Sequence, residues 1–175
     1  MALQRVLVGS PVCERASVLR AFLISLKSLE HEGFLIDYIF IDDNDSEISE
    51  KLLKNFKREG SEVTVLPAVK GSAAEDTDAR KEARLVRVAG YRNRIIRYAM
   101  QKEYDAVFLV DSDLILHPAL VEYLRATQKG VISELFWSKS CAGRSSGPNA
   151  WLMEERAPNS DNRNAALYKN EADRR

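Results

Sequence analysis

Two carboxylates stand one residue apart at the end of an apolar run in the stretch VFLVDSDLILHP, residues 107–118. Alternate residues of an extended segment point the same way, so Asp111 and Asp113 can reach one site while Ser112 points elsewhere. Their oxygens are hard ligands that suit Mg²⁺ or Mn²⁺, and these ions also accept oxygens from a bound phosphate. A DxD pattern alone is better explained by solvation of a strand end, so the metal hypothesis needs support from other residues.

A second acidic cluster, DDND at residues 42–45, follows the apolar run LIDYIFI at residues 35–41. Carboxylates gathered at one edge of a sheet repel each other, and burial raises their pKa values. A divalent cation removes this cost because it supplies compensating charge. The two clusters together therefore favour a site for a metal-bound nucleotide over simple solvation.

The elements that must position these acids alternate along the chain. Short apolar runs predict strands at residues 5–9, 35–41, 62–66, 106–111 and 131–137. Apolar residues at helical spacing predict helices at residues 15–30, 48–56, 83–102 and 118–128, with a long loop over 67–82. This alternation predicts a doubly wound α/β fold, in which a mostly parallel sheet carries helices on both faces.

In a doubly wound sheet, ligands bind outside the carboxyl ends of the strands, where the strand order reverses. The first strand ends at Ser10 and Pro11, the second at the cluster containing Asp43, and the fourth at Asp111 and Asp113. If the first and fourth strands are neighbours, all three ends face one crevice. We therefore expect a single site built from three strand ends.

The composition, with 45% hydrophobic and 30% charged residues in a chain of 175, is that of one soluble globular domain. A formal net charge of 0 gives no global argument for binding nucleic acid or an anionic membrane. No apolar run approaches the roughly 18 residues of a spanning helix. Cys13 and Cys141 lack metal-binding spacing, so we expect two reduced thiols in a cytoplasmic protein, with peripheral contact to a membrane left open.

Other proteins that place an Asp after an apolar strand fit the sequence less well. A Walker-type NTPase needs GxxxxGK[ST], which the chain lacks, and a dinucleotide-binding protein needs GxGxxG where this chain has VLVGSPVCER. An aspartyl-phosphate phosphatase would carry DxD on its first core strand, whereas here three strands precede it. A site for a metal-bound nucleotide therefore stays the preferred interpretation.

The sequence resembles the GT-A glycosyltransferases of family 2 over roughly residues 4–137. The resemblance rests on RVLVGSPV, on FIDDNDSE and on GYRNRIIRYAMQKEYDAVFLVDSD, in that order. It implies a nucleotide-sugar donor carrying UDP or GDP, a divalent metal and a sugar, lipid or protein acceptor. By position, Asp43 would recognise the nucleobase, Asp111 would lie near the ribose and diphosphate, and Asp113 would hold the metal.

One arginine of the third predicted helix stands out from its basic neighbours. Arg92 falls on the stripe of Val88, Ile95 and Ala99, which should face the sheet. An arginine in that position needs an anion. The partner is either an Asp at a strand end or the diphosphate of the nucleotide, and the two alternatives are compatible.

The C-terminal segment, residues 154–175, is polar and has few large apolar side chains. We expect a nucleotide-binding domain at residues 1–153, followed by a loosely held tail. The local candidates for a catalytic base are Glu154 and Glu155, although surface glutamates are common. Two hypotheses follow: a metal-dependent glycosyltransferase, or a non-catalytic module of the same fold that binds a nucleotide or a protein.

Overall fold

The computed structural model describes residues 3–69, 77–133, 137–139 and 146–148, with side chains over 3–69 and 83–133. The strands are β1 (Gln4–Val12), β2 (Phe34–Asp42), β3 (Val63–Pro67), β4 (Ala106–Leu109), β5 (Trp137–Lys139) and β6 (Ser146–Pro148). The helices are α1 (Ala16–Lys27), α2 (Glu47–Lys54), α3 (Thr77–Gln101) and α4 (Leu120–Ala126). The chain forms two compact units, Met1–Gln128 and Lys129–Arg175.

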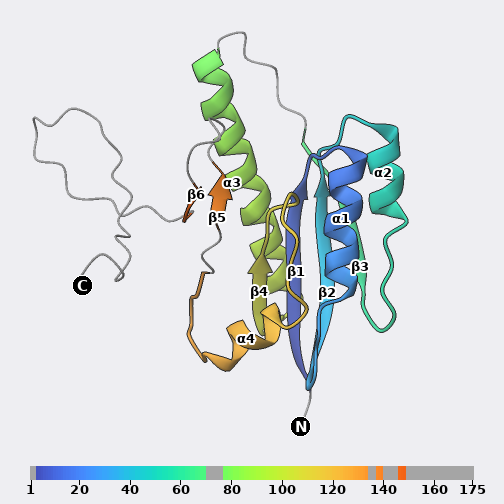
Figure 1. Cartoon of the computed structure of the whole chain (residues 1–175), viewed down its shortest axis with the longest axis vertical. Coiled ribbons are helices and arrows are strands. Elements are labelled where there is room, and N and C mark those ends of the chain that lie inside the picture. Colours follow the sequence, from blue (N-terminus) through green and yellow to red (C-terminus); the bar gives the residue numbers. More distant parts are fainter. Residues whose placement is uncertain (1–2, 70–76, 134–136, 140–145, 149–175) are drawn as a thin grey trace, which may run out of the picture. The chain divides into compact units, whose positions relative to one another are not determined.

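The first unit contains a four-stranded parallel sheet in the order β3-β2-β1-β4. The chain moves outward from β1 through β2 to β3, and then returns to the other side of β1 to form β4. The prediction that the first and fourth strands are neighbours is therefore confirmed. Figure 1 shows this α/β arrangement, while the full doubly wound pattern stays a prediction.

The sheet separates two apolar clusters because successive strand residues point to opposite faces. Val6 and Val8 pack with α1 and α2 on one face, where the cluster also includes Phe22 and Leu53. On the other face, Leu7 packs with residues of α3. In Figure 1, α1 and α2 lie on one side of the sheet and α3 on the other. Helices thus cover both faces, as expected from the near-continuous apolar strands.

Helix α3 differs from the helix expected at residues 83–102. It begins at Thr77, so the second part of the predicted 67–82 loop is helical. The segment TDARKE, residues 77–82, contains good helix formers but no apolar periodicity, and periodicity was the signal for the prediction. The inward stripe is narrower than expected, because Leu85 and Met100 are exposed while Ile95 is fully buried.

The strand expected at residues 131–137 is not found over residues 131–133, where Val131 is 95% exposed. Residues 134–136 lie outside the described residues, and β5 begins at Trp137 and pairs antiparallel with β6. The prediction rested on residue type alone. A strand also needs a hydrogen-bonded neighbour, which residues 131–133 lack among the described residues.

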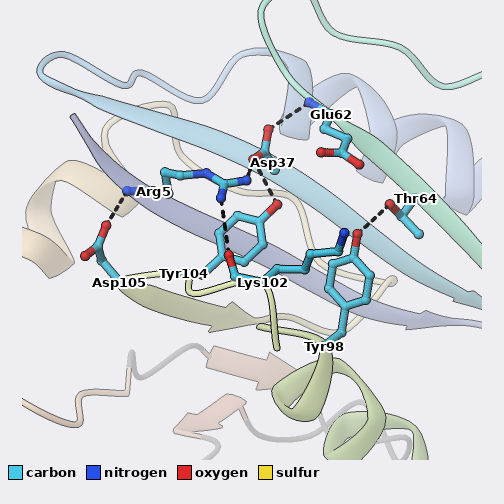
Figure 2. A network of polar contacts seen from close by, with 8 residues as sticks. All are labelled: Arg5, Asp37, Glu62, Thr64, Tyr98, Lys102, Tyr104 and Asp105. Atoms are coloured by element: carbon cyan, nitrogen blue, oxygen red, sulfur yellow. Dashed lines mark hydrogen bonds and ion pairs between the residues drawn. The ribbon is translucent and has the colours of Figure 1, made fainter. Parts of the chain in front are cut away.

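A polar network ties the strands together near the amino ends of β1 and β4 (Figure 2). Asp37 is 7% exposed and accepts hydrogen bonds from Arg5 at 3.0 Å, from the Tyr104 hydroxyl at 2.9 Å and from the Glu62 N–H at 2.7 Å. The backbone N–H of Arg5 donates to Asp105 at 2.7 Å. The buried carboxylate is thus fully bonded within the protein, which is the condition for burying a charge at tolerable cost.

Candidate functional site

A cleft of about 240 Å³ opens at the opposite, carboxyl edge of the sheet. The residues that line it come from the ends of β1, β2 and β4 and from one side of α3. They are Pro11, Val12, Cys13, Glu14, Asp43, Arg84, Arg87, Val88, Tyr91, Arg92, Asp111, Ser112 and Asp113. The expectation that three strand ends would face one crevice is therefore confirmed.

The segment after β1 is held in place by buried polar side chains. The Glu14 N–H donates to Asn44 Oδ1 at 2.9 Å, and the Glu14 carbonyl accepts from the Ser49 hydroxyl at 2.8 Å. Asn44 in turn donates from Nδ2 to Asp42 at 2.7 Å. Both Asn44 and Ser49 are buried. The backbone of Glu14 is therefore fixed relative to β2 and α2.

Asp43 lies directly after β2, and its N–H donates to the Val12 carbonyl at 2.8 Å. Its side chain is 11% exposed and forms an ion pair with Arg87, with 3.5 Å between Nε and Oδ2. On the same helix, burial and then the negative charge of Asp43 raise the pKa of Tyr91. Asp43 is thus a largely buried carboxylate held between the sheet and α3.

The DxD segment follows β4 in a turn. The Val110 N–H continues the ladder by donating to the Gly9 carbonyl at 3.1 Å, which places Asp111 beyond the sheet. Asp111 and Asp113 are exposed and Ser112 is buried. Ser112 nevertheless lines the cleft, so the prediction that it points elsewhere is wrong, because it assumed an extended segment where residues 112 and 113 form a turn. Arg92 donates to Asp111 at 2.5 Å. One of the two alternatives for Arg92, pairing with a strand-end aspartate, is therefore confirmed, and pairing with a diphosphate stays a prediction.

Glu14 and Asp113 approach the cleft from the ends of β1 and β4. Burial, followed by the charge of Asp113, raises the pKa of Glu14. Among the described residues, no three His, Cys, Asp or Glu side chains form a group able to hold a metal. Mg²⁺ and Mn²⁺ can bind through one or two carboxylates when substrate phosphates and water supply the remaining oxygens. Asp111 and Asp113 offer the two carboxylates that such a site requires, and a metal bound there stays a prediction.

Cys13 lies beside the acids and is the exposed free thiol of the described chain. Burial of the sulfur and the charges of Asp43 and Asp45 raise the pKa of the Cys13 thiol. The thiolate is the reactive form of cysteine. The raised pKa of Cys13 therefore favours the protonated thiol, the less reactive form, at neutral pH.

The structure unites most of the residues expected at the site. Pro11 lines the cleft, whereas Ser10 does not, because its side chain is fully buried and donates to the Pro11 carbonyl at 3.2 Å. Glu154 and Glu155 lie outside the described residues.

Eight lining residues were not selected from the sequence as site residues: Val12, Cys13, Glu14, Arg84, Arg87, Val88, Tyr91 and Ser112. Val88 and Arg84 precede Arg92 by four and eight residues, so a helical-wheel projection that started from Arg92 would have found them. Arg87 and Tyr91 lie on an adjacent side of α3 and would have been missed. Glu14 carries no such signal.

Two comparisons with known proteins bear on the site. No protein-family model matches the sequence, and no curated protein matches it. Among the described residues, no helix has the length and apolar content needed to cross a membrane. The resemblance to family-2 GT-A enzymes therefore supports a proposal and does not assign a family.

Proposed function

We propose that the chain binds a nucleoside diphosphate sugar together with a divalent cation in the carboxyl-edge cleft, and that it transfers the sugar to an acceptor. The observation that carries this proposal is the convergence of Asp43, Arg92, Asp111 and Asp113 in one cleft. Each motif is weak alone, but a base-recognising acid, a DxD pair and an arginine in one cavity suit a nucleotide diphosphate. The resemblance in sequence supports the same ligand.

The base would bind at Asp43. An ionised carboxylate only accepts hydrogen bonds, so it favours bases that present a ring N–H, such as uracil and guanine. Arg87 holds this carboxylate on the side of α3 through an ion pair. Asp43 is thus positioned before the ligand arrives, which lowers the cost of ordering it on binding.

The diphosphate would bind between α3 and the DxD turn. Negative charge grows on the departing diphosphate as the bond to the anomeric carbon breaks, and Arg92 can stabilise that charge with paired N–H donors. A divalent cation held by Asp111 and Asp113 would supply Lewis-acid stabilisation of the same oxygens. The acceptor hydroxyl would also need a carboxylate base, for which Glu154 and Glu155 are the sequence candidates.

Calorimetry with UDP, GDP and CDP in the presence of Mn²⁺ tests the binding step. We expect UDP or GDP to bind more tightly than CDP, and EDTA to weaken this binding. In Asp113→Ala the effect of EDTA should disappear, whereas Asp43→Ala should lose the preference between bases. Glu59→Ala, which alters an exposed acid before β3, serves as the control.

Unchanged, metal-dependent binding in Asp113→Ala would refute the assignment of the metal site. Transfer and donor hydrolysis are then assayed with UDP-sugars and GDP-sugars. Binding without either activity would favour the non-catalytic module.

A further inference from the structure

The cleft contains opposing charges in nearly equal number. Three arginines of α3 line the cleft, Arg84, Arg87 and Arg92. Facing them are four carboxylates, those of Glu14, Asp43, Asp111 and Asp113. The arginines all come from one helix and the acids all come from strand ends. A ligand that enters the cleft therefore meets a row of cations on one side and a row of anions on the other.

Two of the arginines form ion pairs with two of the acids in the ligand-free protein. Arg92 contacts Asp111 at 2.5 Å, and Arg87 contacts Asp43 at 3.5 Å. The first pair is about half exposed on both sides, with side-chain exposures of 44% and 53%. Among the described residues, Asp113 and Arg84 form no ion pair. Asp111, one of the two carboxylates proposed to hold the cation, is thus bound to an arginine in the ligand-free protein.

We propose that Arg92 exchanges partners, leaving Asp111 for a diphosphate, so that the cleft takes up a divalent cation and a diphosphate as a pair and disfavours either ion alone. The identity of the anion rests on the proposed function. The exchange itself rests on the Arg92–Asp111 contact and on the position of both residues in the cleft.

The physical reason is competition for the same groups. A carboxylate must be free to bind a metal, and in the absence of an anion the displaced Arg92 would have no partner. A diphosphate without a cation must draw Arg92 away from Asp111 and leave that acid unpaired beside Asp113. When both ions enter, Arg92 can bind phosphate oxygens with its fork of N–H donors while Asp111 binds the cation. Each ion therefore tightens binding of the other, and by linkage the coupling is reciprocal.

Mn²⁺ alone, titrated by electron paramagnetic resonance of the free ion, tests the first half of the exchange. An exposed ion pair is worth at most a few-fold in an equilibrium constant, so Arg92→Gln should tighten Mn²⁺ binding about three- to fivefold. Arg84→Gln removes the same charge from the cleft but releases no described carboxylate, so its effect should be smaller. Equal effects in the two variants would mean that only the overall charge matters, and would overturn the exchange.

Inorganic diphosphate in EDTA tests the second half. Asp111→Asn should tighten its binding more than Asp113→Asn does, because only the former releases Arg92. A gain in Asp111→Asn that is no larger than in Asp113→Asn would overturn the exchange. Neither titration uses a nucleotide. Failure of UDP and GDP to bind would therefore refute the proposed function, whereas the Mn²⁺ and inorganic diphosphate titrations alone decide whether Arg92 exchanges partners.

Discussion

Tyr104 shows how one side chain can link the stability of the sheet to pH. Its hydroxyl donates to Asp37 at 2.9 Å in the amino-edge network of Figure 2. Burial, then the hydrogen bond and charge of Asp37, raise the pKa of Tyr104 well above its usual range. The folded protein therefore holds this proton more tightly than the unfolded chain does.

The free energy of unfolding should consequently fall at alkaline pH. Below the ordinary tyrosine pKa of about 10, both states are protonated and the contribution is fully present. Above it the unfolded chain releases the proton while the folded chain retains it, so stability is lost as the pH rises toward the folded-state pKa. Tyr104→Phe should show a smaller loss between pH 8.5 and pH 11, measured by urea unfolding. An undiminished loss in Tyr104→Phe, relative to the exposed control Tyr123→Phe, would contradict this.

At the residue scale, the sequence predicted the acids of the site better than their surroundings. Asp43, Asp111 and Asp113 could be found because each follows an apolar run, and parallel strands bring their carboxyl ends to one edge. Glu14 could not be found, because its backbone is fixed by Asn44 and Ser49, which lie far along the chain. No local pattern encodes such long-range hydrogen bonds.

At the scale of elements, the contact between β1 and α3 depends on a missing side chain. A Cβ atom added at Gly9 would lie 2.4 Å from Ile95 Cγ2 and 3.3 Å from Ile39 Cγ2. Ile95 is fully buried on α3, between the turns that carry Tyr91 and Ala99. Glycine at this position therefore lets the helix approach the sheet closely, and the helix carries Arg92 to the cleft.

Gly9→Ala should lower the free energy of unfolding by about 1–3 kcal/mol, the usual cost of overpacking a core. Ile95→Ala should also destabilise the protein, because it leaves a cavity. The double variant should lose less than the sum of the two single losses, since the new methyl group enters the vacated space. Urea unfolding of all four proteins measures this coupling. Strict additivity would show that Gly9 and Ile95 do not limit each other.

Most strands and helices of the first unit were predictable because their apolar patterns matched the period of the element that forms. Apolar runs bounded by Gly, Pro and acids marked β1, β2 and β3, and helical spacing marked α1 and α2. The start of α3 was missed because the sequence of residues 77–82, TDARKE, shows no apolar period. Residues 131–133 were misassigned because composition was read without a pairing partner.

At the scale of the molecule, every residue that lines the cleft precedes the boundary between the compact units at Gln128. The two apolar clusters also consist of residues before that boundary. The first unit therefore contains its own core and the whole described cleft. The boundary expected near residue 153, and the loosely held tail beyond it, stay predictions because residues 149–175 lie outside the described residues.

A chain of residues 1–128 should therefore fold by itself and unfold cooperatively, with a melting temperature within a few degrees of that of the whole chain. The fragment should bind the ligand of the cleft with an affinity similar to that of the whole chain. If the catalytic base lies beyond residue 128, the fragment should have no transfer activity. Circular dichroism during heating and calorimetry with UDP and Mn²⁺ check both points. An unfolded fragment would mean that the second unit completes the core.

The buried side-chain amide of Asn44 connects the ends of β1 and β2, because its oxygen accepts one hydrogen bond and its nitrogen donates another. Its Oδ1 accepts from Glu14 while its Nδ2 donates to Asp42. Slow hydrolysis, the commonest ageing reaction of asparagine, would replace that donor with an oxygen. Two carboxylates would then face each other at a residue that is 4% exposed. Such a change would weaken the contact between Asn44 and Asp42 that helps to hold the backbone of Glu14 at the edge of the cleft.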